Sequence, residues 1–201
     1  IRKREQMQIP KLAVIIPCYN EELCIEKTCR RLLEILQMLV EKGKISSDSY
    51  IYCVDDGSKD STWGIIERLH SENSIVKGAT FVRNYGNQKA LIAGLEGVRE
   101  LGCDCAVSID ADLQQDELAI EKFIDEFQNG YDIVLGVRNN RKTDNFFKKT
   151  TAIMFYKLMN LLGSKIAMNH SDYRLVSKKA LDMMELYHEK SLFLRGFFHE
   201  L

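Results

Sequence analysis

The chain has 201 residues, of which 45% are hydrophobic and 28% are charged, so it can bury a core without disulfides or a structural metal. Its 12 Gly and 2 Pro exclude a collagen-like or Pro-rich disordered protein, and no run reaches the ~18 uncharged apolar residues of a membrane-spanning helix. The net charge of -1 is unevenly spread, because residues 1–137 carry 16 Lys and Arg against 23 Asp and Glu whereas residues 138–201 carry 12 against 6.

Short apolar runs alternate with helical patterns along the first two thirds of the chain. The first run, Leu12–Pro17, leads into the polar turn Tyr19–Glu22 and a helix with apolar positions from Ile25 to Leu39. The same order recurs, with strands predicted at Tyr50–Val54, Gly78–Val82, Ala106–Ile109 and Asp132–Leu135 and helices near 61–72, 87–101 and 116–129. Apolar runs that alternate with helices predict an α/β fold with a parallel sheet.

The final third follows a looser pattern. A polar loop at 138–145 precedes a helical segment near 146–162, whose apolar residues share one face with lysines elsewhere. Such a helix packs on its own core or lies on an anionic membrane surface. The basic charge indicates either an anionic partner or a solvated lysine-rich surface. Nucleic acid is the least supported anion, because no zinc-finger spacing, RNP-like run or Gly-x-x-Gly clamp is present.

All six cysteines lie in the first 105 residues, and none forms a C-x2-C pair. Several sit inside apolar runs, which predicts buried free thiols in a reducing compartment. The chain begins with Ile and shows no apolar signal segment before its first predicted strand, so we expect it to be part of a longer cytosolic protein.

Polar residues follow each of the first four predicted strands directly. In a parallel sheet these strand ends meet at one edge, where ligands bind. We therefore expect one site built from the loops Pro17–Glu21, Asp55-Asp56, Arg83-Asn84 and Asp110–Asp112.

Asp110 and Asp112 form a D-x-D pair at the end of the fourth strand. Two carboxylates at this spacing can share a divalent cation, which prefers hard oxygen ligands and readily bridges to diphosphate oxygens. The alternative is that Asp112 caps the helix that follows. Asp55 and Asp56 have a structural alternative as well, since Asp-Asp-Gly-Ser closes many turns.

Several motifs occur in an order that resembles family 2 glycosyltransferases of the GT-A fold. Four of them follow the predicted strands: Ile16–Glu21, Val54–Thr62, Arg83–Leu91 and Asp110–Gln114. Two more, Ser171–Leu175 and Leu194–Gly196, resemble the branch of dolichol-phosphate mannose synthase and bacterial polyprenyl-phosphate glucosyltransferases. The resemblance runs from about residue 11 to the end of the chain.

The resemblance implies a role for each matching position. It places Pro17, Tyr19, Glu21, Asp56 and Asp110 around a nucleotide-sugar. It also gives Asp110, Asp112 and Gln114 a Mg2+ or Mn2+ ion that neutralises the leaving nucleoside diphosphate.

Other matching positions concern the acceptor. Asp172 is the predicted catalytic carboxylate, acting as a general base on a hydroxyl acceptor or orienting a phosphate acceptor that is already ionised. Its alternative is a core or capping Asp. Candidates for binding phosphate groups are Arg138, Arg141, Arg174 and Arg195, each of which can instead form an ordinary surface ion pair.

The resulting prediction is a mostly parallel, Rossmann-like GT-A sheet flanked by helices, with a C-terminal helical region on the acceptor side. We expect residues 11–201 to form one catalytic domain after an extension of residues 1–10. Relatives with membrane anchors continue into hydrophobic helices, so we expect either that such helices have been removed or that the native protein associates peripherally with the membrane. The only Trp is Trp63, so the Gln-x-x-Arg-Trp motif of processive members is missing.

The predicted reaction is the inverting, metal-dependent transfer of one hexose to polyprenyl phosphate at the cytosolic face of a membrane. UDP-glucose or another UDP-sugar is the preferred donor and GDP-mannose the second. Two alternatives remain, namely transfer to a hydroxyl of a cell-surface glycan precursor and a non-catalytic nucleotide-binding module. A homo-oligomer is compatible with the sequence.

Overall fold

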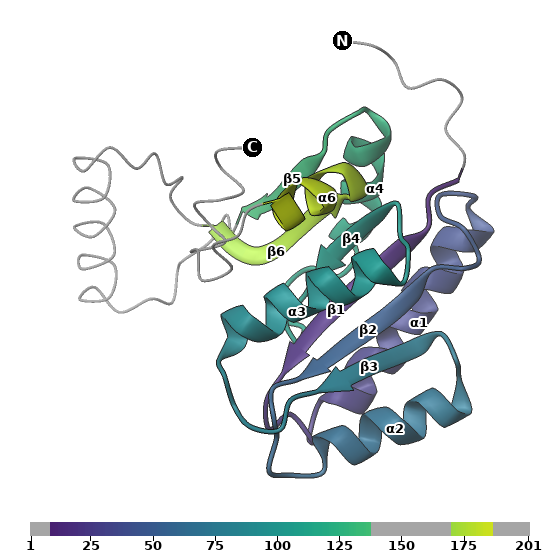
Figure 1. The fold of residues 1–201 in the computed structure, drawn as a ribbon. Helices are drawn as coiled ribbons and strands as arrows, with labels where there is room; N and C mark the ends of the chain where they lie inside the picture. The colour runs from purple at the N-terminus through teal and green to yellow at the C-terminus, as the bar shows by residue number, and fades with distance from the viewer. Residues whose placement is uncertain (1–8, 138–169, 187–201) are drawn as a thin grey trace, which may run out of the picture.

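The computed structural model describes residues 9–137 and 170–186 (Figure 1). Within them, six strands form one sheet in the order β3-β2-β1-β4-β6-β5. The strands are β1 (Leu12–Cys18), β2 (Tyr50–Asp55), β3 (Val76–Thr80), β4 (Cys105–Ser108), β5 (Ile133–Val137) and β6 (His170–Ser177). The described helices are α1 (Ile25–Glu41), α2 (Thr62–Glu72), α3 (Asn87–Glu100), α4 (Ala119–Gln128) and α6 (Lys178–Leu186).

β1 lies inside the sheet, and all seven of its residues are buried. Val14 and Ile16 belong to an apolar cluster with α1, α2 and α4, whereas Ala13 and Ile15 belong to a second cluster with α3 and α6. Figure 1 shows α3 and α6 on the viewer's side of the sheet. Because each buried Ile or Val contributes about 1.5–3 kcal/mol, an unbroken apolar run is stable only where helices cover both faces.

The sheet is mostly parallel, as predicted, and one strand departs from the pattern. β1 pairs in parallel with β2 and β4, and β2 pairs in parallel with β3. β6 runs antiparallel between β4 and β5. No strand was predicted at His170–Ser177, and the structure adds it to the sheet as β6.

β3 was predicted two residues too late. The run Gly78–Val82 reads as apolar, but pairing with β2 ends where Thr80 lies opposite Asp55, the last residue of β2. Beyond this point the chain has no neighbouring strand, and Val82 is 95% exposed in the following loop.

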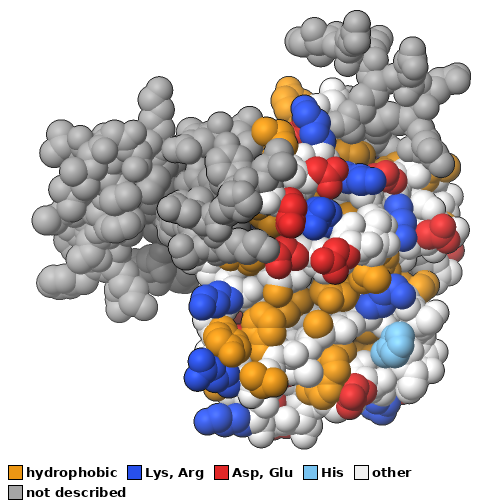
Figure 2. All heavy atoms as spheres, in the orientation of Figure 1, with side chains coloured by type: hydrophobic (Ala, Val, Ile, Leu, Met, Phe, Trp, Pro, Cys, Tyr) orange, Lys and Arg blue, Asp and Glu red, His pale blue; other side chains and the backbone are white. Residues whose placement is uncertain are grey.

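On the face shown in Figure 2, side chains of both charges lie beside a patch of hydrophobic side chains. No described helix is long and apolar enough to cross a bilayer. All six cysteines lie in the described part of the chain and are free thiols, five of them buried. The predicted helix near 146–162 lies outside the described residues.

Candidate active site

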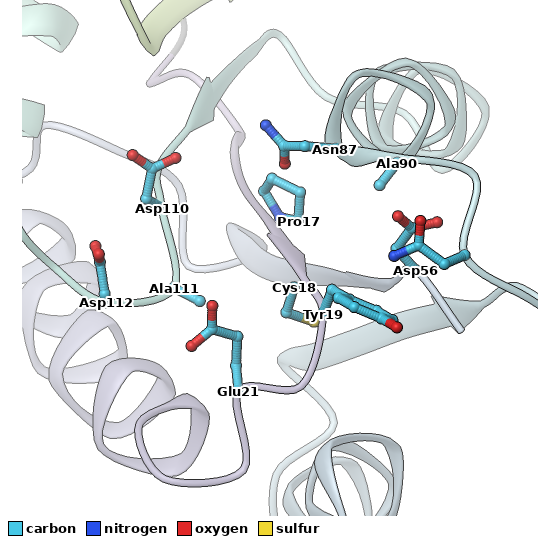
Figure 3. A pocket seen from close by; sticks show the side chains of 11 residues that line it. Pro17, Cys18, Tyr19, Glu21, Asp56, Asn87, Ala90, Asp110, Ala111 and Asp112 are labelled. Carbon is cyan, nitrogen blue, oxygen red and sulfur yellow. The ribbon is translucent and has the colours of Figure 1, made fainter. Parts of the chain in front are cut away.

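A pocket of about 340 Å³ opens at the carboxyl ends of the central strands. It is lined by Pro17, Cys18, Tyr19, Glu21, Asp56, Asn84, Asn87, Ala90, Asp110, Ala111 and Asp112. Figure 3 shows the carboxylates of Asp110, Asp112 and Glu21 on one side of the pocket and Asp56 with Tyr19 on the other, with Pro17 between them. The four loops predicted to meet at this edge of the sheet all contribute to it.

The pocket occupies the point where the order of the strands reverses. The chain passes from β1 outward to β2 and β3 and then returns to β4 on the other side of β1. The Ile15 carbonyl accepts a backbone hydrogen bond from Ile109, the residue that follows β4. Residues two apart in a strand face the same neighbouring strand, so Pro17 also faces the chain that leaves β4, beyond the end of that strand. A proline, which has no N–H to donate, therefore lies where β1 and β4 have separated and the ladder has ended.

The loop after β1 is held by the loop after β2. The backbone N–H of Asn20 donates to Ser58 Oγ at 2.8 Å, and Asn20 Oδ1 accepts from the backbone N–H of Lys59 at 2.8 Å. The backbone N–H of Glu21 donates to Thr62 Oγ1, also at 2.8 Å. These cross-links hold Asn20 at a φ of 55°, a left-handed conformation that Asn tolerates better than most residues. They position Tyr19 and Glu21 at the pocket.

Asp56 holds the loop between β3 and α3. Asp56 is 2% exposed, and its carboxylate accepts hydrogen bonds from the backbone N–H groups of Tyr85 and Gly86 at 2.7 and 2.8 Å. Each carboxylate oxygen can accept a second hydrogen bond, so Asp56 can hold this loop and bind a ligand at the same time.

Asp55 has a different role from its neighbour. It accepts hydrogen bonds from the backbone N–H and hydroxyl of Ser58 and from the Thr80 hydroxyl at 2.7 Å. Asp55 does not line the pocket. The alternative interpretation, in which the Asp-Asp-Gly-Ser segment closes a turn, is therefore confirmed for Asp55. Asp56, in contrast, lines the pocket.

The β3–α3 loop also brings positive charge and a helix N-terminus to this edge of the sheet. Arg83 and Lys89 lie over the ring of Tyr85, at 4.9 and 5.6 Å from its centroid. α3 begins at Asn87, and Asn87 and Ala90 from its first turn line the pocket. The positive end of the α3 dipole therefore favours an anionic group here.

Asp110 is held by Gln115, a residue that the motifs did not single out. Gln115 Oε1 accepts the backbone N–H of Asp110 at 2.8 Å, and Gln115 Nε2 donates to Asp110 Oδ2. The next residue is held from α1, because the buried hydroxyl of Thr28 donates to the Ala111 carbonyl at 2.5 Å. Two buried side chains thus fix the first half of the D-x-D loop.

Asp112 is exposed and accepts the backbone N–H of Gln114 at 3.1 Å. The alternative that Asp112 caps the next helix is wrong, because α4 begins at Ala119, with Leu118 at its cap. Gln114 is exposed and does not line the pocket. Its assignment as a metal ligand stays a prediction.

Cys24 reports on the negative charge at this side of the pocket. Its thiol donates to Glu21 Oε2 at 3.0 Å. Burial, the hydrogen bond to Glu21 and the negative charges of Glu21 and Asp112 together raise the pKa of Cys24 to about 12. Carboxylates from two different loops, the loop after β1 and the loop after β4, therefore both lie close enough to the Cys24 thiol to raise its pKa.

The chemistry of these side chains suits a hard divalent cation, although they do not enclose one. Within residues 9–137 and 170–186, no group of three or more His, Cys, Asp or Glu residues is arranged to hold a metal ion. Asp110 and Asp112 supply oxygen ligands on one side only, so the remaining ligands would come from a bound diphosphate and water. An ion would then be held only together with its substrate.

The predicted acceptor-side residues are not brought into the pocket by the described part of the chain. Arg138, Arg141 and Arg195 lie outside the described residues. Asp172 belongs to β6, and its side chain is not described. Arg174 lies on β6 opposite Ser108, is 2% exposed and does not line the pocket. All five roles stay predictions.

Five pocket residues were not among the predicted site residues although the motifs contained them: Cys18, Asn84, Asn87, Ala90 and Ala111. The available signal was the position of each motif at the end of a strand, which identified the segments around the pocket without ranking the residues within them.

Comparison with known proteins agrees with this geometry. A family model described as glycosyl transferase family 2 matches residues 13–184. YkoT of Bacillus subtilis (strain 168), an uncharacterized glycosyltransferase, is 48% identical over 187 residues, which cover 93% of this chain and 55% of the relative. The bactoprenol glucosyl transferase of Shigella phage SfX is 36% identical over 190 residues, covering 92% and 58%. The chain thus spans little more than half the length of these relatives.

A solved structure shares the fold. Glucosyl-3-phosphoglycerate synthase from Mycobacterium tuberculosis, in complex with Mn2+, uridine-diphosphate and phosphoglyceric acid, matches with a TM-score of 0.55 at 21% identity. The match covers 85% of this chain and 56% of that chain. It confirms the predicted fold class.

Proposed function

This chain belongs to glycosyl transferase family 2, and we propose that it transfers one hexose from a nucleotide-sugar to polyprenyl phosphate as part of a longer enzyme. The acceptor class is supported by the name of the relative from Shigella phage SfX, a bactoprenol glucosyl transferase at 36% identity. The observation that carries the proposal is the pocket of about 340 Å³, in which Tyr19 and Asp56 lie across from the carboxylates of Asp110 and Asp112.

The donor lies along the pocket. Tyr19 and Asp56 bind the nucleoside, because an aromatic ring packs against a base and a carboxylate accepts hydrogen bonds from a base imino group or ribose hydroxyls. The diphosphate lies between the first turn of α3 and the pair Asp110 and Asp112. A UDP-sugar is the first choice of donor and GDP-mannose the second.

Asp110 and Asp112 would hold a Mg2+ or Mn2+ ion, and when bound the ion supplies positive charge beside the leaving diphosphate. The protein's own groups do the remaining work. Asp110 is preorganised by its hydrogen bonds, so its orientation costs little when the donor binds. The positive end of α3 stabilises negative charge on the diphosphate as the sugar bond breaks.

The acceptor attacks from the side of the C-terminal residues. An oxygen of polyprenyl phosphate bonds to the anomeric carbon, the bond from that carbon to the diphosphate oxygen breaks, and the configuration inverts. A phosphate oxygen is already ionised at pH 7, so Asp172 orients the acceptor rather than removing a proton. Arg138, Arg141 and Arg195 bind its phosphate, and the reaction takes place at the cytosolic face of a membrane.

The test is a transfer assay with the full chain, radiolabelled UDP-glucose and undecaprenyl phosphate in detergent micelles with Mn2+. Label should move into the lipid-extractable fraction, and the matched reaction with the unphosphorylated polyprenol should yield none. Transfer to the polyprenol but not to its phosphate would contradict the proposed acceptor. Absence of transfer from both UDP-glucose and GDP-mannose would favour a nucleotide-binding module instead.

A further inference from the structure

Gln115 is a buried amide next to the carboxylate pair. Its side chain is 7% exposed and lies outside the set of residues that line the pocket. Both ends of the amide bind the same residue: Oε1 accepts the Asp110 backbone N–H at 2.8 Å, and Nε2 donates to Asp110 Oδ2. A residue that only filled space here would need neither contact.

The two contacts fix different parts of Asp110. The bond to its N–H sets the backbone as the chain leaves β4, where Ile109 is already bonded to Ile15. The bond to Oδ2 sets the rotation of the carboxylate. Asp112, by comparison, is exposed and bonds to the backbone of Gln114 two residues later.

We propose that Gln115 is a positioning residue that holds the carboxylate of Asp110 in the orientation needed to bind the divalent cation. The inference rests on the proposed function, because it gives Asp110 a metal to bind. A neutral amide suits this task, since it orients a carboxylate through a hydrogen bond without neutralising the charge that attracts the cation. A lysine or arginine at this position would instead neutralise the charge of Asp110 and weaken its attraction for the cation.

Burial also distinguishes Gln115 from the adjacent Gln114. Gln114 is exposed and its described hydrogen bond is made by its backbone, so its side chain does not hold Asp110 in the described contacts. Of the two adjacent glutamines, the structure thus assigns the positioning role to the buried one.

The experiment replaces Gln115 by methionine, which has a similar length and volume but lacks the amide. Mn2+ binding is measured by electron paramagnetic resonance, with the full chain and saturating UDP. Gln115→Met should weaken Mn2+ binding about 10-fold, the lower end of the effect of removing a group that orients a metal ligand. The matched control is Gln128→Met on α4, where the amide donates to the Lys44 carbonyl at 3.4 Å; it should leave Mn2+ binding unchanged.

Thermal unfolding shows whether the variants stay folded. If Gln115→Met unfolds, Gln115→Asn is measured in its place, because its amide is too short to make both contacts. Unchanged Mn2+ affinity in the folded variant, with a wild type that binds Mn2+, would overturn the positioning role and leave the proposed function standing. A wild type that binds UDP but no Mn2+ would overturn both.

Discussion

Replacing Gly57 by alanine tests how the β3–α3 loop is held beside the pocket. Gly57 follows Asp56 and has a φ of +68°, a left-handed conformation. A Cβ at this position would lie 2.4 Å from the carbonyl carbon of Arg83 and 2.6 Å from its Cα. Backbone atoms cannot swing aside as a flexible side chain can, so the loop itself would have to move.

The expected loss of stability has two parts. A left-handed φ costs a non-glycine residue about 1–2 kcal/mol, and forcing a methyl group against a packed backbone adds about 1–3 kcal/mol. Gly43 provides the matched control, because it has the same φ of +68° and a Cβ there meets nothing within 4 Å. Gly43→Ala should therefore lose only the first part.

Urea unfolding followed by circular dichroism measures both variants, and UDP titration follows the pocket. Gly57→Ala should lose about 1–3 kcal/mol more than Gly43→Ala. It should also bind UDP more weakly, because displacement of Arg83 moves the adjacent Asn84 that lines the pocket. Equal losses of stability in the two variants, with equal UDP affinity, would refute this account of the loop.

Three further substitutions probe the site. Thr28→Val removes the donor to the buried Ala111 carbonyl and should cost about 1–3 kcal/mol in urea unfolding; no loss would mean that the D-x-D loop does not depend on α1. Asp56→Asn replaces one of the two oxygens that hold the Tyr85 and Gly86 N–H groups. It should lower the free energy of unfolding by about 1.5 kcal/mol and weaken UDP binding, and wild-type UDP affinity would argue against a nucleoside contact. Asp172→Asn should lower kcat only modestly with a phosphate acceptor, and near-complete loss, with the acidic limb of the pH profile moved upward, would instead favour a hydroxyl acceptor.

The parts of the fold that could be predicted are those encoded by short segments of sequence. Leu12–Cys18 is an unbroken apolar run, and only a strand covered on both faces buries it completely. Asp56 and Asp110 directly follow such runs, so their arrival at one edge of a parallel sheet follows from topology alone. The strand ends therefore indicated the site before its geometry was known.

The remaining features depend on contacts between distant segments. β6 inserts antiparallel between β4 and β5, and its sequence, in which four of the first five residues are polar or charged, gives no local sign of that pairing. The role of Gln115 is equally invisible in sequence, because two adjacent glutamines differ only in which one is buried. The close approach of Gly57 to Arg83 arises from packing between the loops after β2 and β3.

The most direct test of the central claim is calorimetric titration of UDP into the protein with Mn2+ and, separately, with EDTA. If Asp110 and Asp112 hold an ion that bridges to the diphosphate, Mn2+ should tighten UDP binding by roughly 5–150-fold, the usual range for coupled ligands. Uridine, which lacks the diphosphate, should bind equally in both buffers. Equal UDP affinity with and without Mn2+ would contradict the account.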